Sequence, residues 1–76
     1  MIVVREATIP NKKIIQVLWA IEATAGIMSI NPSKKARRKL EKIAEELGAN
    51  AIISYTIKKD FLDTGALATG TAVIVG

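Results

Sequence analysis

The side chains that most often perform chemistry in proteins are nearly absent from this sequence. Its 76 residues include no Cys and no His. Nucleophilic catalysis needs a Ser, Thr or Cys next to a base, which is usually His. The three serines, Ser29, Ser33 and Ser54, fall in contexts typical of a loop, a helix cap and a strand. We therefore expect no catalytic residue and no enzymatic activity.

Metal ligands are equally scarce. Soft metals prefer thiolate, thioether or imidazole ligands, and the only sulfur atoms belong to Met1 and Met28. We expect no metal site and no cofactor. One pair of carboxylates, Asp60 and Asp63, could bind a hard cation. Asp and Gly are also the usual residues of a solvated turn, which is the interpretation we favour for residues 59–65.

The strongest chemical signal is a basic segment. Residues 33–48 contain six cations and three acids, so this segment carries +3 of the chain's net charge of +4. The cations lie mainly in the N-terminal part of this segment. The N-terminus of a helix is the positive end of its dipole, so cations there are disfavoured. Two interpretations stay open. The segment is either a solvated helix face, with ion pairs between subunits, or a possible anion-binding site for phosphate or a nucleic-acid backbone.

The anion-binding interpretation rests on the first two turns of the expected helix. Its candidate residues are Lys34, Lys35, Arg37 and Arg38, assisted by the free N–H groups of the helix start. The three aromatic residues are scattered, so no stacking platform for bases accompanies the charge. Any binding of nucleic acid would therefore be weak and electrostatic.

Five elements must position these residues. We expect strands at 2–9, 13–25, 51–58 and 66–75, and one amphipathic helix over 32–47. Asn31 and Pro32 signal the start of the helix, and Gly48 signals its end. The order β-β-α-β-β in a single domain, 1–76, predicts an α+β fold with a small antiparallel sheet and one helix packed on it.

Apolar periodicity predicts which faces are buried. On the helix, the apolar residues Ala36, Leu40, Ile43, Ala44 and Leu47 fall within one arc that should lie on the sheet. Strict alternation along residues 13–25 predicts that one entire face of this strand points into the core. The residues of this face are Ile15, Val17, Trp19, Ile21 and Ala23.

Chain length makes a monomer marginal. Burial of apolar surface should stabilise a chain of this mass by about 110 kcal/mol, and ordering its residues costs about the same. Half of the residues are hydrophobic, and the mean hydropathy is +0.31. This composition predicts a homo-oligomer. No apolar stretch approaches the ~20 residues of a membrane span, so we expect no membrane contact, no signal peptide and a cytoplasmic location.

Two segments resemble a known family. They are Ala44-Glu45-Glu46-Leu47-Gly48-Ala49-Asn50-Ala51-Ile52-Ile53 and Ala68-Thr69-Gly70-Thr71-Ala72-Val73-Ile74-Val75. Both are similar to the YbjQ-like family, which is labelled as a putative heavy-metal-binding domain and has no known biochemical function. The opening, Ile9-Pro10 with Lys12-Lys13-Ile14-Ile15, is also similar. We assign structural roles to the matched residues Gly48, Asn50, Thr69, Gly70 and Thr71.

The resemblance implies a dodecin-like fold assembled into a ring, commonly a pentamer. The chain departs from the family pattern in two places. The Arg- and Gly-rich insert before the helix is missing, and Trp19 stands where the family tends to have a small residue. We therefore expect a self-assembling structural or small-ligand-binding module of unknown function. The alternative is an anion- or nucleic-acid-binding protein that uses the basic helix.

Overall fold

The computed structural model describes residues 1–26, 31–59 and 65–76. The elements are β1 (Ile2–Val3), β2 (Ile14–Ala25), α1 (Pro32–Glu46), β3 (Ala51–Lys59) and β4 (Ala66–Val75). The four strands form one sheet in the order β1-β3-β4-β2. Met28, Ser29, Asp60 and Asp63 lie outside the described residues.

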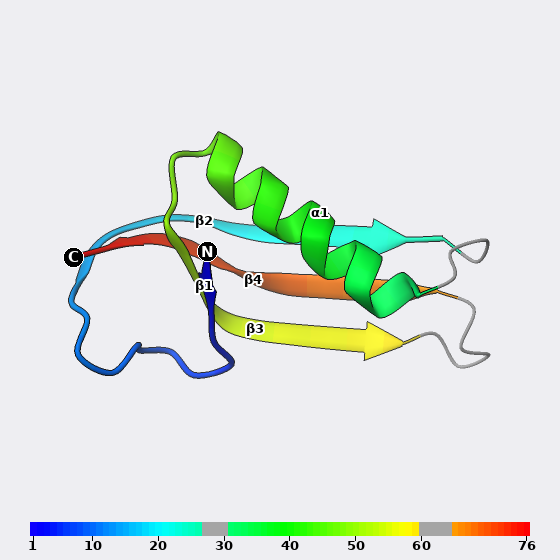
Figure 1. Ribbon diagram of the computed structural model, residues 1–76, viewed down its shortest axis with the longest axis horizontal. Coiled ribbons are helices and arrows are strands. Elements are labelled where there is room, and N and C mark those ends of the chain that lie inside the picture. Colours follow the sequence, from blue (N-terminus) through cyan, green and yellow to red (C-terminus); the bar gives the residue numbers. More distant parts are fainter. Residues whose placement is uncertain (27–30, 60–64) are drawn as a thin grey trace.

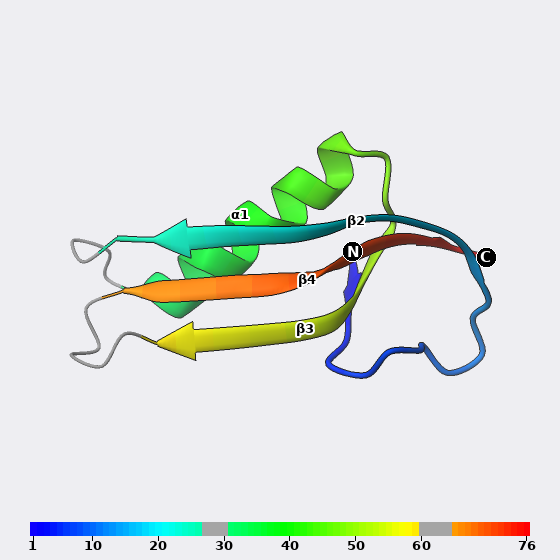
Figure 2. The ribbon, with the colours of Figure 1, turned by 180° about the vertical axis from the view of Figure 1, so that it is seen from behind.

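The sheet and the helix form two layers. Helix α1 crosses one face of the sheet (Figure 1), and the opposite face carries no helix (Figure 2). The α+β class and the order β-β-α-β-β are confirmed. The sheet is mixed rather than purely antiparallel, because β4 pairs antiparallel with both β2 and β3 while β1 pairs parallel with β3.

The first strand is shorter than the predicted 2–9. After β1 the chain keeps bonding to β3, through Val4 N–H to Ile52 O at 3.0 Å and Tyr55 N–H to Val4 O at 2.9 Å. Glu6 O also accepts from Ser54 N–H of β3 at 2.8 Å. After Glu6 the chain leaves the edge of the sheet, and Ile9 is buried in a second cluster with Ala51 and Val73. Packing of Ile9 against these residues is incompatible with a straight strand over residues 2–9, which explains why β1 is short.

The predicted burial of the apolar face of β2 is confirmed for Ile21 and Ala23 and is wrong for Ile15, Val17 and Trp19, which lie near two register shifts. The shifts lie between Ile14 and Gln16 and between Val17 and Trp19. A bulge adds one residue to a strand, so the alternation of inward and outward side chains changes at that point. Leu18, which the alternation placed on the mixed face, packs against the main core. Ile15, Val17 and Trp19 are 66%, 60% and 64% exposed.

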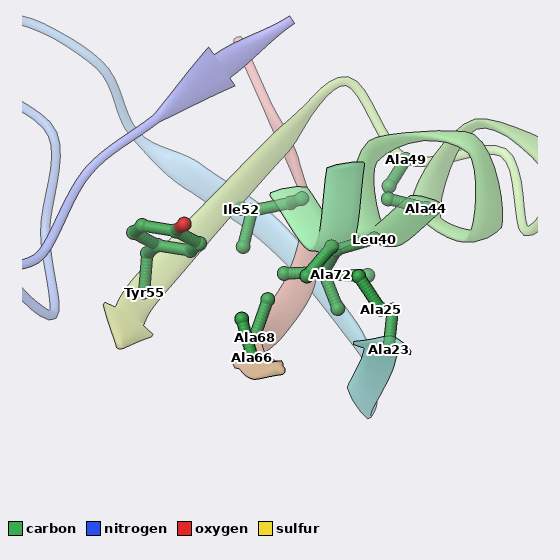
Figure 3. Close-up of a cluster of buried hydrophobic side chains, with 11 residues drawn as sticks. Ala23, Ala25, Leu40, Ala44, Ala49, Ile52, Tyr55, Ala66, Ala68 and Ala72 are labelled. Carbon is green, nitrogen blue, oxygen red and sulfur yellow. The ribbon is translucent and has the colours of Figure 1, made fainter. Parts of the chain in front are cut away.

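The main core between helix and sheet is built mostly from alanine (Figure 3). Its buried residues are Ala23, Ala25, Ala36, Leu40, Ala44, Ala49, Ile52, Tyr55, Ala66, Ala68 and Ala72. Alanine allows α1 to lie close to the sheet, but each alanine removes little apolar area from water. The helix therefore lies close to the sheet, and the core between them is thin.

Both ends of α1 follow the signals in the sequence. Asn31 is the N-cap, and its Oδ1 accepts from Lys34 N–H at 3.2 Å. At the other end Gly48 has a φ of +88°, which glycine adopts without strain. Gly48 N–H donates to Glu45 O at 3.0 Å, and Ala49 N–H donates to Ala44 O at 2.9 Å. This pair of bonds is a Schellman motif.

Asn50 ties the connection after the helix to the end of β4. Its Nδ2 donates to Val75 O at 2.8 Å, and its Oδ1 accepts from Val75 N–H at 2.8 Å. The Asn50 N–H also donates to Val73 O at 3.2 Å. The side-chain amide thus continues the ladder between β3 and β4 past the point where β3 begins.

Replacing Asn50 with Ala should remove both amide bonds and leave the backbone groups of Val75 without these partners. At about 1 kcal/mol of net stabilisation per bond, we expect the free energy of unfolding to fall by about 2 kcal/mol. Urea denaturation at fixed protein concentration measures this change. Glu45→Ala, an exposed position on α1, is the control and should stay within about 0.5 kcal/mol of the wild type. Equal stability of Asn50→Ala and wild type would contradict the role assigned to the amide.

Candidate functional site

The four candidate anion-binding residues are all exposed on the first turns of α1. They do not all point the same way. The guanidinium of Arg37 lies 5.6 Å from the centre of the buried Tyr55 ring, and that of Arg5 lies 6.0 Å from the same ring. These distances fit cation–π contacts. Arg37 therefore has a packing role on β3, while Lys34, Lys35 and Arg38 remain candidates for contact with an anion.

The start of α1 offers an anion fewer N–H groups than expected. Pro32 has no N–H, and Lys34 N–H is capped by the Asn31 side chain. Lys35 N–H donates to Asn31 O at 3.0 Å. An anion at this end would therefore be held mainly by side chains. Such contacts are weaker and more sensitive to salt than contacts to a preorganised helix terminus.

The matched family residues lie at points of close backbone contact. A Cβ atom at Gly70 would stand 2.5 Å from Ile52 Cγ2 and 3.3 Å from Ile53 O. Any larger residue would push β4 away from its neighbour and from Leu40 of the helix. Thr69 and Thr71 are half-buried on either side of this glycine. Their positions indicate structural roles in the sheet.

The face of the sheet without the helix carries a shallow open hollow of about 460 Å³. A bulge in β3 helps to form it, because the register shifts between Ile53 and Thr56. Ser54 in this bulge has a φ of 54°, and its N–H donates to Glu6 O at 2.8 Å. The lining residues are Ala20, Ile21, Glu22, Ser54, Thr69, Gly70 and Thr71. The polar groups of this lining are the Glu22 carboxylate and the hydroxyls of Ser54, Thr69 and Thr71. All four residues are exposed or half-buried, so the hollow is a weak site for any ligand.

The edge formed by β2 is the strongest functional feature. Among the described residues, β2 pairs only with β4, so its other edge forms no ladder with a further strand. Ile15, Val17 and Trp19 of the same strand are each at least 60% exposed. A long strand with a free edge and large exposed apolar side chains is typical of a surface that pairs with another chain.

Sequence reasoning missed the location of this surface but not its existence. The high mean hydropathy predicted surplus apolar area, whereas strict alternation placed Ile15, Val17 and Trp19 inside. The bulges of β2 depend on the partner strand β4 and leave no local mark in the sequence. The contact of Arg5 and Arg37 with Tyr55 was also missed, because it joins three separate segments.

Comparison with known proteins supports a family assignment. The sequence model of a family described as "Putative heavy-metal-binding" matches residues 28–76. The chain is also similar to the crystal structure of a protein with unknown function, of the DUF74 family, from Pediococcus pentosaceus ATCC 25745. The TM-score is 0.65 at 17% identity, with 100% of this chain and 98% of that chain covered. No curated protein matches the chain.

The described residues contain no candidate metal centre. In residues 1–26, 31–59 and 65–76, no group of three or more His, Cys, Asp or Glu side chains is placed to hold an ion. In the same ranges no helix has the length and apolar character needed to cross a membrane.

Titration with zinc, cadmium or copper(I) should reveal no specific soft-metal site. The reason is chemical, because the chain has no thiolate and no imidazole and only two thioethers. Isothermal calorimetry on protein freed of metal by a chelator is the measurement. Met28→Leu is the matched variant. A stoichiometric sub-micromolar site in the wild type would contradict the prediction, and its loss in Met28→Leu would identify the thioether as the ligand.

Proposed function

The chain belongs to the YbjQ-like family, and we propose that it serves as a non-catalytic module that assembles with copies of itself into a closed homo-oligomer. The resemblance to the family favours five subunits. The assembly is a scaffold or a holder of a small ligand, and we propose a cytoplasmic location for it. The absence of Cys is compatible with that compartment.

The observation that carries this proposal is the apolar edge of β2. Ile15, Val17 and Trp19 are each at least 60% exposed, on a strand that pairs with β4 alone among the described strands. Covering such a strand with another subunit pairs the backbone and buries the apolar side chains at once. It also prevents uncontrolled pairing with other chains.

The surface area of the chain agrees with this proposal. Its accessible surface is 5098 Å², whereas a compact monomer of this mass is expected to expose about 4,500 Å². The excess follows from the elongated shape, with extents of 38 × 22 × 16 Å, and from the thin alanine core. A single copy therefore buries less surface than a typical protein of its size, and contacts between subunits would add the missing burial.

Val17→Lys should weaken assembly. A lysine at this position would have to lose water or remain unpaired at an apolar contact, which costs about 3 kcal/mol or more. This cost corresponds to at least a hundredfold rise in the dissociation constant. Light scattering and native mass spectrometry at micromolar concentration measure the change. Wild type should be larger than one chain, and Val17→Lys should be mostly monomeric.

The matched control is Leu47→Lys. Leu47 is another large exposed apolar residue, at 39% exposure, but it caps α1 and lies on neither sheet edge. This variant should assemble as the wild type does. A stable wild-type monomer whose unfolding is independent of concentration would refute the proposed function.

Anion binding by α1 is the second candidate. Its supporting observation is that the first turn contains no acidic residue and that Lys34, Lys35 and Arg38 are exposed. A ring would repeat these cations once in every subunit, so weak contacts to a long polyanion would add up. Nothing here contacts base edges, so such binding would not depend on base order.

Changing Lys34, Lys35 and Arg38 together to Gln, and leaving Arg37 on Tyr55, should abolish binding to single-stranded DNA at low salt and leave assembly intact. Fluorescence anisotropy against salt concentration measures this, because phosphate contacts give a steep salt dependence. The control changes the same number of charges elsewhere, at the exposed Lys12, Lys13 and Lys58. Equal loss of binding in both variants would show that net charge, not α1, is responsible.

A further inference from the structure

Two arginine side chains converge on the ring of Tyr55. The guanidinium of Arg5 lies 6.0 Å from the ring centre, and that of Arg37 lies 5.6 Å from it. Arg5 follows β1, Arg37 lies in α1 and Tyr55 lies in β3, at the margin of the main core (Figure 3). Tyr55 is only 8% exposed, whereas both arginines are exposed. Three segments that are far apart in the sequence thus place two solvent-accessible cations over one buried ring.

The backbone holds Arg5 beside Tyr55 from both sides. Val4 O accepts from Tyr55 N–H at 2.9 Å, and Glu6 O accepts from Ser54 N–H at 2.8 Å. Both bonds attach this segment to the bulge of β3. Ser54 has a φ of 54° in this bulge, a left-handed conformation that costs energy in any residue other than glycine. The segment that carries Arg5 is therefore fixed on β3 rather than free in a loop.

The cluster concentrates positive charge and leaves hydrogen-bond donors available. Because both distances are measured to one ring centre, the two guanidiniums lie at most about 12 Å apart, close to the screening length at moderate salt, so they repel each other. A cation–π contact does not satisfy the five N–H donors of a guanidinium. Neither guanidinium takes part in a side-chain hydrogen bond between described residues. Glu41 follows Arg37 by one helical turn, in the less favourable order for an ion pair.

From these observations we infer that Arg5 and Arg37 bind a single phosphate group, with the ring of Tyr55 as the floor of the site. A phosphate monoester offers up to two negative charges and three free oxygens, so it accepts from both guanidinium forks and relieves their repulsion. A phosphodiester of nucleic acid has one charge and two free oxygens and fits less well. This inference rests on the small-ligand role in the proposed function, for which it names the ligand chemistry, and it does not depend on assembly.

An NMR titration follows each arginine separately. The chain has three arginines, Arg5, Arg37 and Arg38, so an isotope-labelled sample at mildly acidic pH gives three Nε–Hε signals. Inorganic phosphate should shift the signals of Arg5 and Arg37 along one saturable curve and leave that of Arg38 nearly unchanged. Chloride at the same ionic strength should shift none of them. Tighter binding of glycerol phosphate than of inorganic phosphate would identify the ligand as a phosphorylated molecule, and the reverse order would identify it as the free ion.

Paired variants test the two arginines. Arg5→Gln combined with Arg37→Gln removes both forks and should raise the dissociation constant for phosphate at least tenfold, as measured from the amide signals around Tyr55. Lys35→Gln combined with Arg38→Gln removes the same charge from other sides of α1 and should bind phosphate as the wild type does. Arg5→Lys combined with Arg37→Lys keeps both charges near the ring but loses the forks. It should fold as the wild type does and bind phosphate several-fold more weakly, which keeps the test valid if the Gln variant fails to fold.

Several outcomes would overturn the inference. Absence of a saturable shift at Arg5 and Arg37 would leave these residues with a packing role alone. Equal shifts at all three arginines would show a general attraction of anions to a basic protein. Unchanged phosphate affinity in the Gln variant of Arg5 and Arg37 would place the anion elsewhere. Light scattering on the same samples measures assembly independently, so a monomeric wild type that binds phosphate at Arg5 and Arg37 would refute the proposed self-assembly and support this site.

Discussion

The close approach of α1 to the sheet is the constraint on which the rest of this structure depends. Eight of the eleven buried residues between the two layers are alanines, and Gly70 stands where a Cβ atom would strike Ile52. Small side chains on both surfaces let the layers approach closely, but they bury little apolar area per residue. Leu40 and Ile52 are the largest fully buried side chains of this core.

A thin core has a direct consequence for the rest of the surface. Ile15, Val17 and Trp19 would be the obvious residues to enlarge the core, yet α1 leaves them uncovered. The bulges in β2 bring Leu18 rather than Val17 against the core. The chain thus leaves Ile15, Val17 and Trp19 exposed on a terminal strand of the sheet, where another molecule could cover them. In the proposed homo-oligomer, this distribution of residue sizes would couple folding to assembly.

The sequence predicts the parts of this fold that depend on local signals. Asn31, Pro32 and Gly48 mark the ends of the helix because capping and left-handed backbone are properties of a few neighbouring residues. The bulges of β2 and the shortness of β1 could not be predicted, because they depend on β4 and on the packing of Ile9. The sequence predicts a structural role for Asn50 but not its partner, because its amide bonds Val75, which is 25 residues away.

The family match and the candidate interface involve different parts of the chain. Residues 28–76 include α1, β3 and β4, together with Gly48, Asn50 and Gly70. These residues maintain the close contact between helix and sheet. Strands β1 and β2 precede the matched range and form the two edges of the sheet. Likeness to a solved structure at 17% identity extends over the whole chain, so the fold tolerates large changes in sequence. The shared part explains how the domain folds, whereas the exposed apolar residues of β2 lie outside the matched range.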